Sequence, residues 1–420
     1  MEFKLVLSMV KKIGRRMWFF IINVIVLLLS MFIPKTSKIV ILGGWTGQRF
    51  ADNSRYLFLY LNKYKSELNL RKVVWITRKK NIRDELRDGG YISCLANSLS
   101  GGYYHLRAKY HFIDWGIKDI NPFFSVRTKR VNLWHGIPLK KIGYLMEGTA
   151  DNSWQENKFY DFLKTISSCG FWNDSHLLVP SPHNLELFRR AFNKSYRRLI
   201  VANYPRVDYL RQEEDYFLLK AEAELRSMLE SLRHGNKILA YLPTFRDNRE
   251  LTILGAEGPG ELKQFDRFLA DNDLILLVKM HFAEKMFQRA NVEVINRNNE
   301  FNHIIFVPPE ADVYSFLKFC DLLITDYSSV YYDFLALNRP IIFFPFDYNY
   351  YANQDRGFAQ VYENATPGDK VRNLNELKKS IIENLNFPTK YEDERQALFS
   401  ISFDLNRAPG YKFIMENLDN

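Results

Sequence analysis

Residues 322–344 constrain the fold of this chain more than any other stretch. An apolar run, Leu322-Leu323-Ile324, leads into a polar turn, Thr325-Asp326-Tyr327-Ser328-Ser329, and then into a helix-like stretch, residues 330–337. A second apolar run, residues 341–344, follows. Two short apolar runs joined by a helix are typical of neighbouring parallel strands. The sequence therefore predicts a βαβ unit with the polar turn at the carboxyl end of a buried strand.

The polar turn has two interpretations. It supplies backbone N–H groups at the start of a helix and the hydroxyls of Ser328 and Ser329, which suit a phosphate. Ligands of open α/β sheets bind outside the carboxyl ends of the strands. The alternative is a plain capped loop, because Ser and Asp cap helices in proteins of every class.

The alternation of β-rich runs and helical stretches continues along most of the chain, which is typical of α/β proteins with parallel sheets. A charged helical stretch, residues 215–232, separates two series of strands. We expect two Rossmann-like domains that face a cleft. The predicted strands are residues 39–42, 73–76, 110–114, 131–133, 177–179 and 199–201, then 238–242, 274–279, 304–307, 322–324 and 341–344.

This pattern predicts five segments along the chain. Residues 1–37 form a basic and apolar membrane-associating segment, and residues 38–205 form an N-terminal α/β domain. Residues 206–236 are a helical linker, residues 237–390 a C-terminal α/β domain, and residues 391–420 a C-terminal helical segment.

The positive charge is concentrated at the start of the chain. Residues 1–38 hold seven Lys and Arg residues and one Glu, which accounts for +6 of the net charge of +10. A positive charge confined to one short segment argues against a broad surface that binds nucleic acid. The longest apolar run, residues 17–33, follows five of these basic residues. Its 17 residues are at the lower limit for a membrane span.

Basic residues before an apolar run keep the N-terminus in the cytoplasm, so a span would place the rest of the chain outside the cell. A protein that uses a cytoplasmic nucleotide cannot be arranged in that way. We therefore expect residues 17–33 to lie in the cytoplasmic face of the cell membrane, against anionic lipid, as a peripheral or monotopic anchor. A transmembrane span is the alternative.

Three further polar clusters follow predicted strands. Trp134-His135-Gly136 precedes a loop in which His135 is a candidate general base, although a lone histidine is more often structural. Thr244 and Arg246 follow the strand at residues 238–242, and an arginine there can bind a phosphate or pair with a nearby carboxylate. Lys279 and His281 end the strand at residues 274–279.

The last two clusters and the turn after Ile324 meet at one sheet edge if the second sheet is parallel. Arg246, His281, Thr325, Ser328 and Ser329 would line a pocket of pyrophosphate size, with His135 facing it from the other domain. Such a site suits phosphoryl transfer, which needs proton removal and stabilisation of the leaving group. No carboxylate cluster indicates an obligatory metal, because Asp271-Asn272-Asp273 precedes a strand and is interpreted as a turn.

A family resemblance rests on seven segments that occur in order. The chain resembles the CDP-glycerol glycerophosphotransferase family, which includes teichoic-acid primases and polymerases and related capsule polymerases. The matching segments are residues 43–47 with 52–53, residues 134–143, residues 204–208, residues 242–247, residues 279–281, residues 325–333 with 338–340, and residue 347 with 356–358.

The resemblance implies a GT-B-like fold, a CDP-linked polyol phosphate donor, a lipid-linked acceptor and release of CMP, with no cofactor. His135 and His281 are the expected catalytic residues. The expected donor contacts are Thr244, Arg246, Lys279, Thr325, Asp326, Ser328, Ser329 and Asp333. The expected acceptor side consists of Gly136, Lys140, Asp52 and Asn53.

Two other functions fit the same sequence. One is a glycosyltransferase with a nucleotide-sugar donor, which would release a nucleoside diphosphate instead of CMP. The other is a non-catalytic membrane scaffold of a polymer-export complex, which would turn over no donor. Glycerol, ribitol or another polyol fits the donor equally well, and no motif indicates an oligomeric state.

Overall fold

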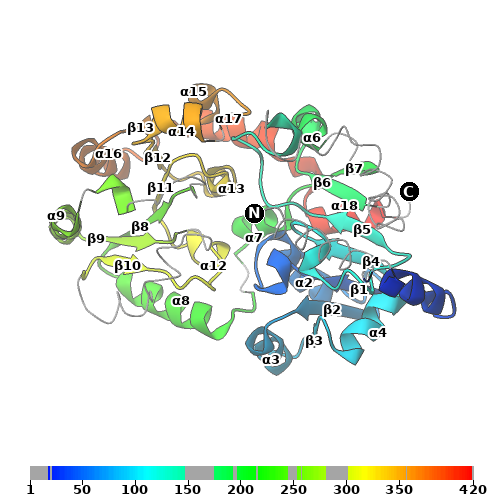
Figure 1. Cartoon of the computed structure of the whole chain (residues 1–420). Helices are drawn as coiled ribbons and strands as arrows, with labels where there is room; N and C mark the ends of the chain where they lie inside the picture. Colours follow the sequence, from blue (N-terminus) through cyan, green and yellow to red (C-terminus); the bar gives the residue numbers. More distant parts are fainter. Residues whose placement is uncertain are drawn as a thin grey trace, which may run out of the picture. The chain divides into compact units, whose positions relative to one another are not determined.

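The computed structural model describes residue 18 and residues 21–146, 175–192, 196–213, 216–244, 253–256, 258–280, 301–355 and 357–418. The chain divides into two compact units. The N-terminal unit comprises Met1–His135, Met146–Pro205 and Arg407–Asn420, and the C-terminal unit comprises Gly136–Leu145 and Arg206–Asn406. Each unit contains one sheet flanked by helices (Figure 1). The expected α/β fold with two parallel sheets is confirmed.

The sheet of the N-terminal unit has the strand order β3-β2-β1-β4-β5-β6-β7, and its neighbouring strands are parallel. The order reverses between β1 and β4, so the carboxyl ends of these two strands mark the switch point at which α/β sheets commonly bind ligands. The strands are β1 (Thr36–Leu42), β2 (Lys72–Thr77), β3 (Ile92–Leu95), β4 (Ala108–Ile113), β5 (Lys129–Asn132), β6 (Ser175–Val179) and β7 (Arg198–Val201).

The sheet of the C-terminal unit has the order β10-β9-β8-β11-β12-β13 and is also parallel. Its order reverses between β8 and β11, so the polar turn that follows β11 lies at the switch point. The strands are β8 (Lys237–Leu242), β9 (Leu274–Val278), β10 (Ile304–Phe306), β11 (Leu322–Thr325), β12 (Ile341–Phe343) and β13 (Asp369–Lys370).

Helices connect these strands. In the N-terminal unit, residues 21–31 are helical, and the other α-helices are α2 (Asp52–Lys63), α3 (Lys80–Asp88), α4 (Leu99–Arg107), α6 (Leu185–Phe192) and α18 (Gly410–Glu416). Short 3-10 turns follow three strands there, η1 (Trp45–Gly47), η2 (Ile117–Asp119) and η5 (Pro182–Asn184). The remaining α-helices are α7 (Pro205–Arg211), α8 (Lys220–Leu232), α9 (Pro259–Ala270), α12 (Tyr314–Leu317), α13 (Val330–Phe334), α14 (Tyr348–Gln354), α15 (Tyr362–Ala365), α16 (Leu374–Asn386) and α17 (Glu392–Ser402).

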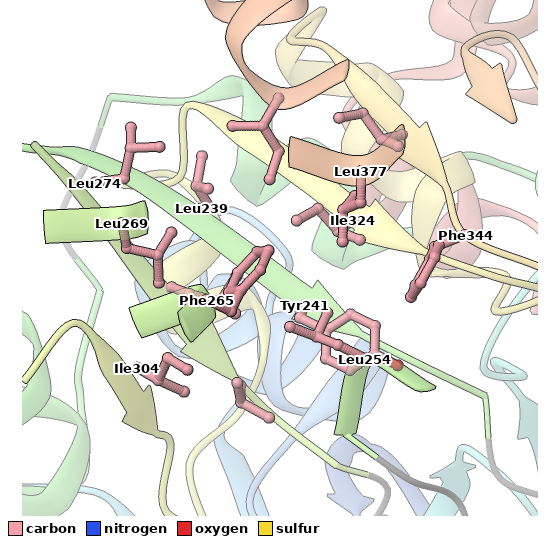
Figure 2. Close-up of a cluster of buried hydrophobic side chains, with 14 of the residues drawn as sticks. Leu239, Tyr241, Leu254, Phe265, Leu269, Leu274, Ile304, Ile324, Phe344 and Leu377 are labelled. Carbon is pink, nitrogen blue, oxygen red and sulfur yellow. The ribbon is translucent and has the colours of Figure 1, made fainter. Parts of the chain in front are cut away.

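The core of the C-terminal unit forms where helices cover both faces of the central strands. All five residues of β9 are buried, as expected for a parallel strand with helices on each side. On one face of the sheet, Leu239 and Ile324 belong to a cluster with Phe265 of α9 and Leu377 of α16 (Figure 2). Burial on both faces explains why these strands are continuous apolar runs in the sequence.

All eleven predicted strands are present, whereas β3 and β13 were missed. β3 is four residues long and includes Ser93, and β13 is the two-residue edge pair Asp369–Lys370. Both are too short and too polar to be recognised from apolar periodicity. Within the described ranges, no helix is both long enough and apolar enough to cross a membrane.

Candidate functional site

The turn after β11 is attached to the end of β8 by two side chains. The Thr325 hydroxyl donates to the Leu242 carbonyl at 2.6 Å. Asp326 Oδ1 accepts the backbone N–H of Thr244 at 2.8 Å and that of Tyr327 at 2.5 Å. Thr325 and Asp326 are both fully buried. Their side chains therefore fix the shape of the turn at the switch point.

Ser328 and Ser329 differ from these two residues. Both are half-buried, and neither hydroxyl has a hydrogen-bond partner among the residues that the structure describes. They directly precede α13, so their backbone and side-chain donors lie at the carboxyl edge of the sheet. Two hydroxyls at a switch point that bond to no described residue can donate hydrogen bonds to an anionic oxygen.

Asp333 is paired within the C-terminal unit. The Arg206 guanidinium lies 3.0 Å from its Oδ2, and the Tyr314 hydroxyl donates to the same oxygen at 2.8 Å. The side chains of Arg206 and Asp333 are 1% and 2% exposed. Arg206 was not among the predicted site residues, although the segment at residues 204–208 that carries the family resemblance contains it. Direct contact between Asp333 and a donor stays a prediction.

Of the remaining residues predicted at the donor site, the structure describes Lys279 and Thr244. Lys279 Nζ donates to the carbonyls of Pro308 at 2.9 Å and Pro309 at 3.2 Å. Thr244 uses its backbone N–H to hold Asp326. Arg246 and His281 lie outside the described residues, so their roles stay predictions.

The loop that follows His135 packs inside the C-terminal unit. Gly136 has φ +155°, and a Cβ on this residue would lie 2.5 Å from Ser329 Oγ. Lys140 forms a β-bridge with Phe358, and the Gln360 side chain donates to the Pro138 carbonyl at 2.8 Å. Gly136 and Lys140, predicted on the acceptor side, are thus brought together with elements of the C-terminal unit, and only glycine fits beside Ser329.

His135 is the last residue of this segment of the N-terminal unit, after β5. Its Nδ1 lies 3.3 Å from the Asp114 carbonyl oxygen. Three indole rings surround the imidazole, with centroid distances of 6.0 Å for Trp45, 6.1 Å for Trp115 and 4.1 Å for Trp134. The side chain is half-buried. Such a setting holds an imidazole in one orientation, as a general base requires.

Asp52 and Asn53 support the same loop from the start of α2. The Asn53 amide donates to the Trp134 carbonyl at 2.9 Å, and Asp52 Oδ1 accepts the Asn53 N–H at 2.8 Å. Asp52 and Trp134 have φ of +65° and +58°, and Trp45 has φ +48°. Side chains other than glycine rarely adopt such angles, and their clustering is typical of functional sites.

Two buried carboxyl groups, Asp114 and Asp119, complete this region and were missed by the sequence analysis. Burial raises the pKa of Asp114 well above its ordinary value, and the neighbouring Asp52 and Asp119 raise it further. Burial also raises the pKa of Asp119, although four backbone N–H groups oppose that shift. Asp114 is the last residue of the predicted strand at residues 110–114, and this position at a strand end was the available signal. Within the described ranges, no group of three His, Cys, Asp or Glu residues is arranged to hold a metal ion.

Comparisons with known proteins agree with this architecture. The family model described as CDP-Glycerol:Poly(glycerophosphate) glycerophosphotransferase matches residues 25–405. The chain is 28% identical over 403 residues to a teichoic acid poly(glycerol phosphate) polymerase of Bacillus spizizenii, covering 92% of this chain and 93% of the relative. It is 27% identical to a teichoic acid glycerol-phosphate transferase of Staphylococcus aureus, covering 79% and 80% of the two chains.

A solved structure shares the fold. A variant of the wall teichoic acid polymerase TagF, soaked with CDPG, matches with a TM-score of 0.68 at 23% identity. The match covers 92% of this chain and 89% of that chain.

Proposed function

The chain belongs to the CDP-glycerol:poly(glycerophosphate) glycerophosphotransferase family, and from this premise we propose that it transfers glycerol phosphate from CDP-glycerol to a hydroxyl of a lipid-linked acceptor. The reaction releases CMP and belongs to teichoic-acid or related capsule-polymer synthesis. The family match over residues 25–405 is the observation that carries this conclusion.

The C-terminal unit provides the donor site. Ser328 and Ser329 donate to the pyrophosphate, because their hydroxyls lie at the switch point and bond to no described residue. Arg246 and His281 follow β8 and β9 in the sequence and supply positive charge to the same phosphates. Thr325 and Asp326 hold the turn in the required shape.

His135 acts on the acceptor. The imidazole removes the proton from the acceptor hydroxyl, and the oxygen attacks the phosphorus atom that carries glycerol. The new P–O bond forms as the bond to the CMP oxygen breaks, and CMP leaves with the electron pair. Hydrogen bonds and positive charge at the phosphates stabilise the leaving group. No obligatory metal or cofactor is part of this proposal.

The helix at residues 21–31 supports attachment to the cytoplasmic face of the membrane. Its polar residues Asn23 and Ser30 are fully buried, whereas Ile25, Leu28 and Leu29 are between 51% and 59% exposed. The Arg127 guanidinium donates to the Ser30 carbonyl at 2.5 Å. The helix therefore packs Asn23, Val26 and Ser30 against the protein and leaves a second set of apolar side chains exposed. This arrangement suits shallow insertion into a bilayer.

The released nucleotide tests the reaction. Purified protein is incubated with CDP-glycerol, CDP-ribitol or nucleotide sugars and a lipid acceptor. Release of CMP from CDP-glycerol is the expected result. A nucleoside diphosphate released from a nucleotide sugar would indicate a glycosyltransferase, and no turnover with any donor would indicate a scaffold.

Two sets of variants test the residues. His135→Ala is expected to lower kcat by roughly 10²–10⁴-fold with little change in donor affinity. His183→Ala is the control, because this histidine of the same unit is exposed. Wild-type turnover by His135→Ala would remove this residue from the mechanism.

Ser328→Ala and Ser329→Ala should each weaken donor binding or turnover by about 1–3 kcal/mol, whereas the exposed Ser400→Ala should not.

A further inference from the structure

Asp119 connects the two loops that surround His135. Its Oδ2 accepts the backbone N–H groups of Asp114 at 2.9 Å, Trp115 at 2.8 Å and Gly116 at 3.2 Å. Its Oδ1 accepts the N–H of Thr46 at 2.6 Å. The side chain is almost fully buried. One carboxylate therefore joins the loop after β4 to the η1 turn after β1.

Both of these loops contact the imidazole of His135. The loop after β4 supplies the Asp114 carbonyl, 3.3 Å from Nδ1, and the Trp115 ring. The η1 turn supplies the Trp45 ring, which also packs edge-on against Trp115 at a centroid distance of 6.1 Å. Asp119 itself does not touch the imidazole, so it acts on His135 only through the backbone that it holds.

The contact at Nδ1 selects a tautomer. A carbonyl oxygen only accepts hydrogen bonds, so Nδ1 must carry the proton in this contact. In the neutral imidazole Nε2 is then unprotonated, and it is the nitrogen that can accept a proton. The orientation of the Asp114 carbonyl therefore determines which imidazole nitrogen is the base.

We propose that Asp119 is a positioning residue that holds the Asp114 carbonyl against His135 Nδ1 and so selects the tautomer in which Nε2 is unprotonated and can act as the base. This inference rests on the proposed role of His135. An ionised carboxylate is suited to this task, because both oxygens accept hydrogen bonds. An asparagine has one accepting oxygen, and its NH₂ group would face a backbone N–H at the other position.

Asp119→Asn provides the kinetic test. The variant is expected to lower kcat roughly tenfold or more with unchanged KM for CDP-glycerol, and to shift the acid limb of the pH profile. When it is combined with His135→Ala, Asp119→Asn should cause no further loss of kcat, because both changes remove the same function. The opposite outcome is a kcat of the double variant that lies below that of His135→Ala by the full factor that Asp119→Asn causes alone. In that case Asp119 has only a structural role and the proposal is wrong.

Asp266→Asn is the matched control. The Asp266 carboxylate also accepts three backbone N–H groups, those of Asn302, His303 and Ile304, in the C-terminal unit. Its loss should affect stability without a change in the pH profile. A pH profile altered equally by both variants would contradict the proposal.

The tautomer is measured independently of activity. Imidazole ¹⁵N spectra of the full chain should show that His135 of the wild type has a protonated Nδ1 and an unprotonated Nε2. The signals of His135 are assigned by their absence from the spectrum of His135→Ala. Asp119→Asn should mix the two tautomers. A wild-type His135 protonated at Nε2 would overturn the inference even if the variant does not fold. If His135→Ala stays active, the base role fails, and the spectra still decide whether Asp119 sets the tautomer.

Discussion

At the residue scale, neighbouring polar side chains of the C-terminal unit have different tasks. Thr325 and Asp326 bond to the backbone at the end of β8 and are buried, whereas Ser328 and Ser329 are half-buried with hydroxyls that bond to no described residue. Asp333, eight residues after Thr325, is neutralised by Arg206. Side chains that complete the fold and side chains available to a ligand thus alternate within one turn and the helix that follows it.

The buried pair Arg206–Asp333 predicts a large effect on stability. Asp333→Ala removes the carboxylate that pairs with a buried guanidinium, so we expect the free energy of unfolding to fall by about 3–5 kcal/mol. Glu230→Ala breaks the exposed pair Arg226–Glu230 of the same unit and should cost about 0.5 kcal/mol or less. Denaturant unfolding measures both. Unchanged stability with weakened donor binding would instead mark Asp333 as a donor contact.

At the scale of elements, the junction of α4 and β4 depends on a neutral histidine. His105 Nδ1–H donates to the Gly101 carbonyl at 2.6 Å, and Nε2 accepts the Asn121 N–H at 3.1 Å. Protonation would place a second imidazole N–H against the N–H of Asn121. Burial lowers the pKa of His105 from 6.5 to about 4, and the charges of Lys35 and Arg78 lower it further.

From the lowered pKa of His105 we predict that the protein loses stability in acid. Below pH 6.5 the unfolded chain binds a proton at His105, whereas the folded chain does not until about pH 4. The stabilisation is therefore complete above pH 6.5 and is lost as the pH falls towards 4, by roughly 3 kcal/mol. His105→Gln should reduce this pH dependence in thermal unfolding. The exposed His183→Gln should not, and an equal slope in all three proteins would contradict the assignment.

The helix at residues 21–31 predicts binding to lipid vesicles. Replacing the exposed Leu28, Leu29 and Phe32 by serine removes apolar surface and leaves the buried side of the helix intact. We expect the variant to lose sedimentation with anionic vesicles while its melting temperature stays near the wild-type value. Replacing Val361 and Phe387, which are exposed in the C-terminal unit, is the matched control. Unchanged vesicle binding by the helix variant would exclude this face.

At the scale of the whole molecule, the positive charge is concentrated where the proposed attachment to the cytoplasmic face of the membrane requires it. The first 38 residues carry +6 of the net +10, and the exposed apolar side chains of residues 21–32 come shortly after most of that charge. Each basic residue near an anionic surface adds about 1 kcal/mol to binding, and apolar insertion adds a part that salt does not screen.

Protease accessibility in cells tests the topology of the whole chain. A cytoplasmic attachment predicts that residues after Pro34 resist protease added to intact cells and are cut once the membrane is opened. A transmembrane span predicts cleavage in intact cells. High salt should release the full chain only partly, whereas deletion of residues 1–33 should keep activity on a short soluble acceptor and lose efficiency on membrane acceptor.

The sequence by itself determined the α/β class, eleven strands and the turn at Ser328 and Ser329, because each of these is a local pattern. Strands buried on both faces are continuous apolar runs, and a turn after such a run must lie at the carboxyl edge of its sheet. The four polar clusters could be predicted for the same reason.

Only the tertiary structure decided which polar residues are already bonded. Strand order places the switch points between β1 and β4 and between β8 and β11, and no local pattern contains that order. Arg206 meets Asp333 across 127 positions of the chain, and Asp119 meets Thr46 across 73. Hydrogen bonds between residues so distant in sequence form only when the sheets assemble. These hydrogen bonds form because a buried charge or a buried N–H group without a partner is costly in free energy.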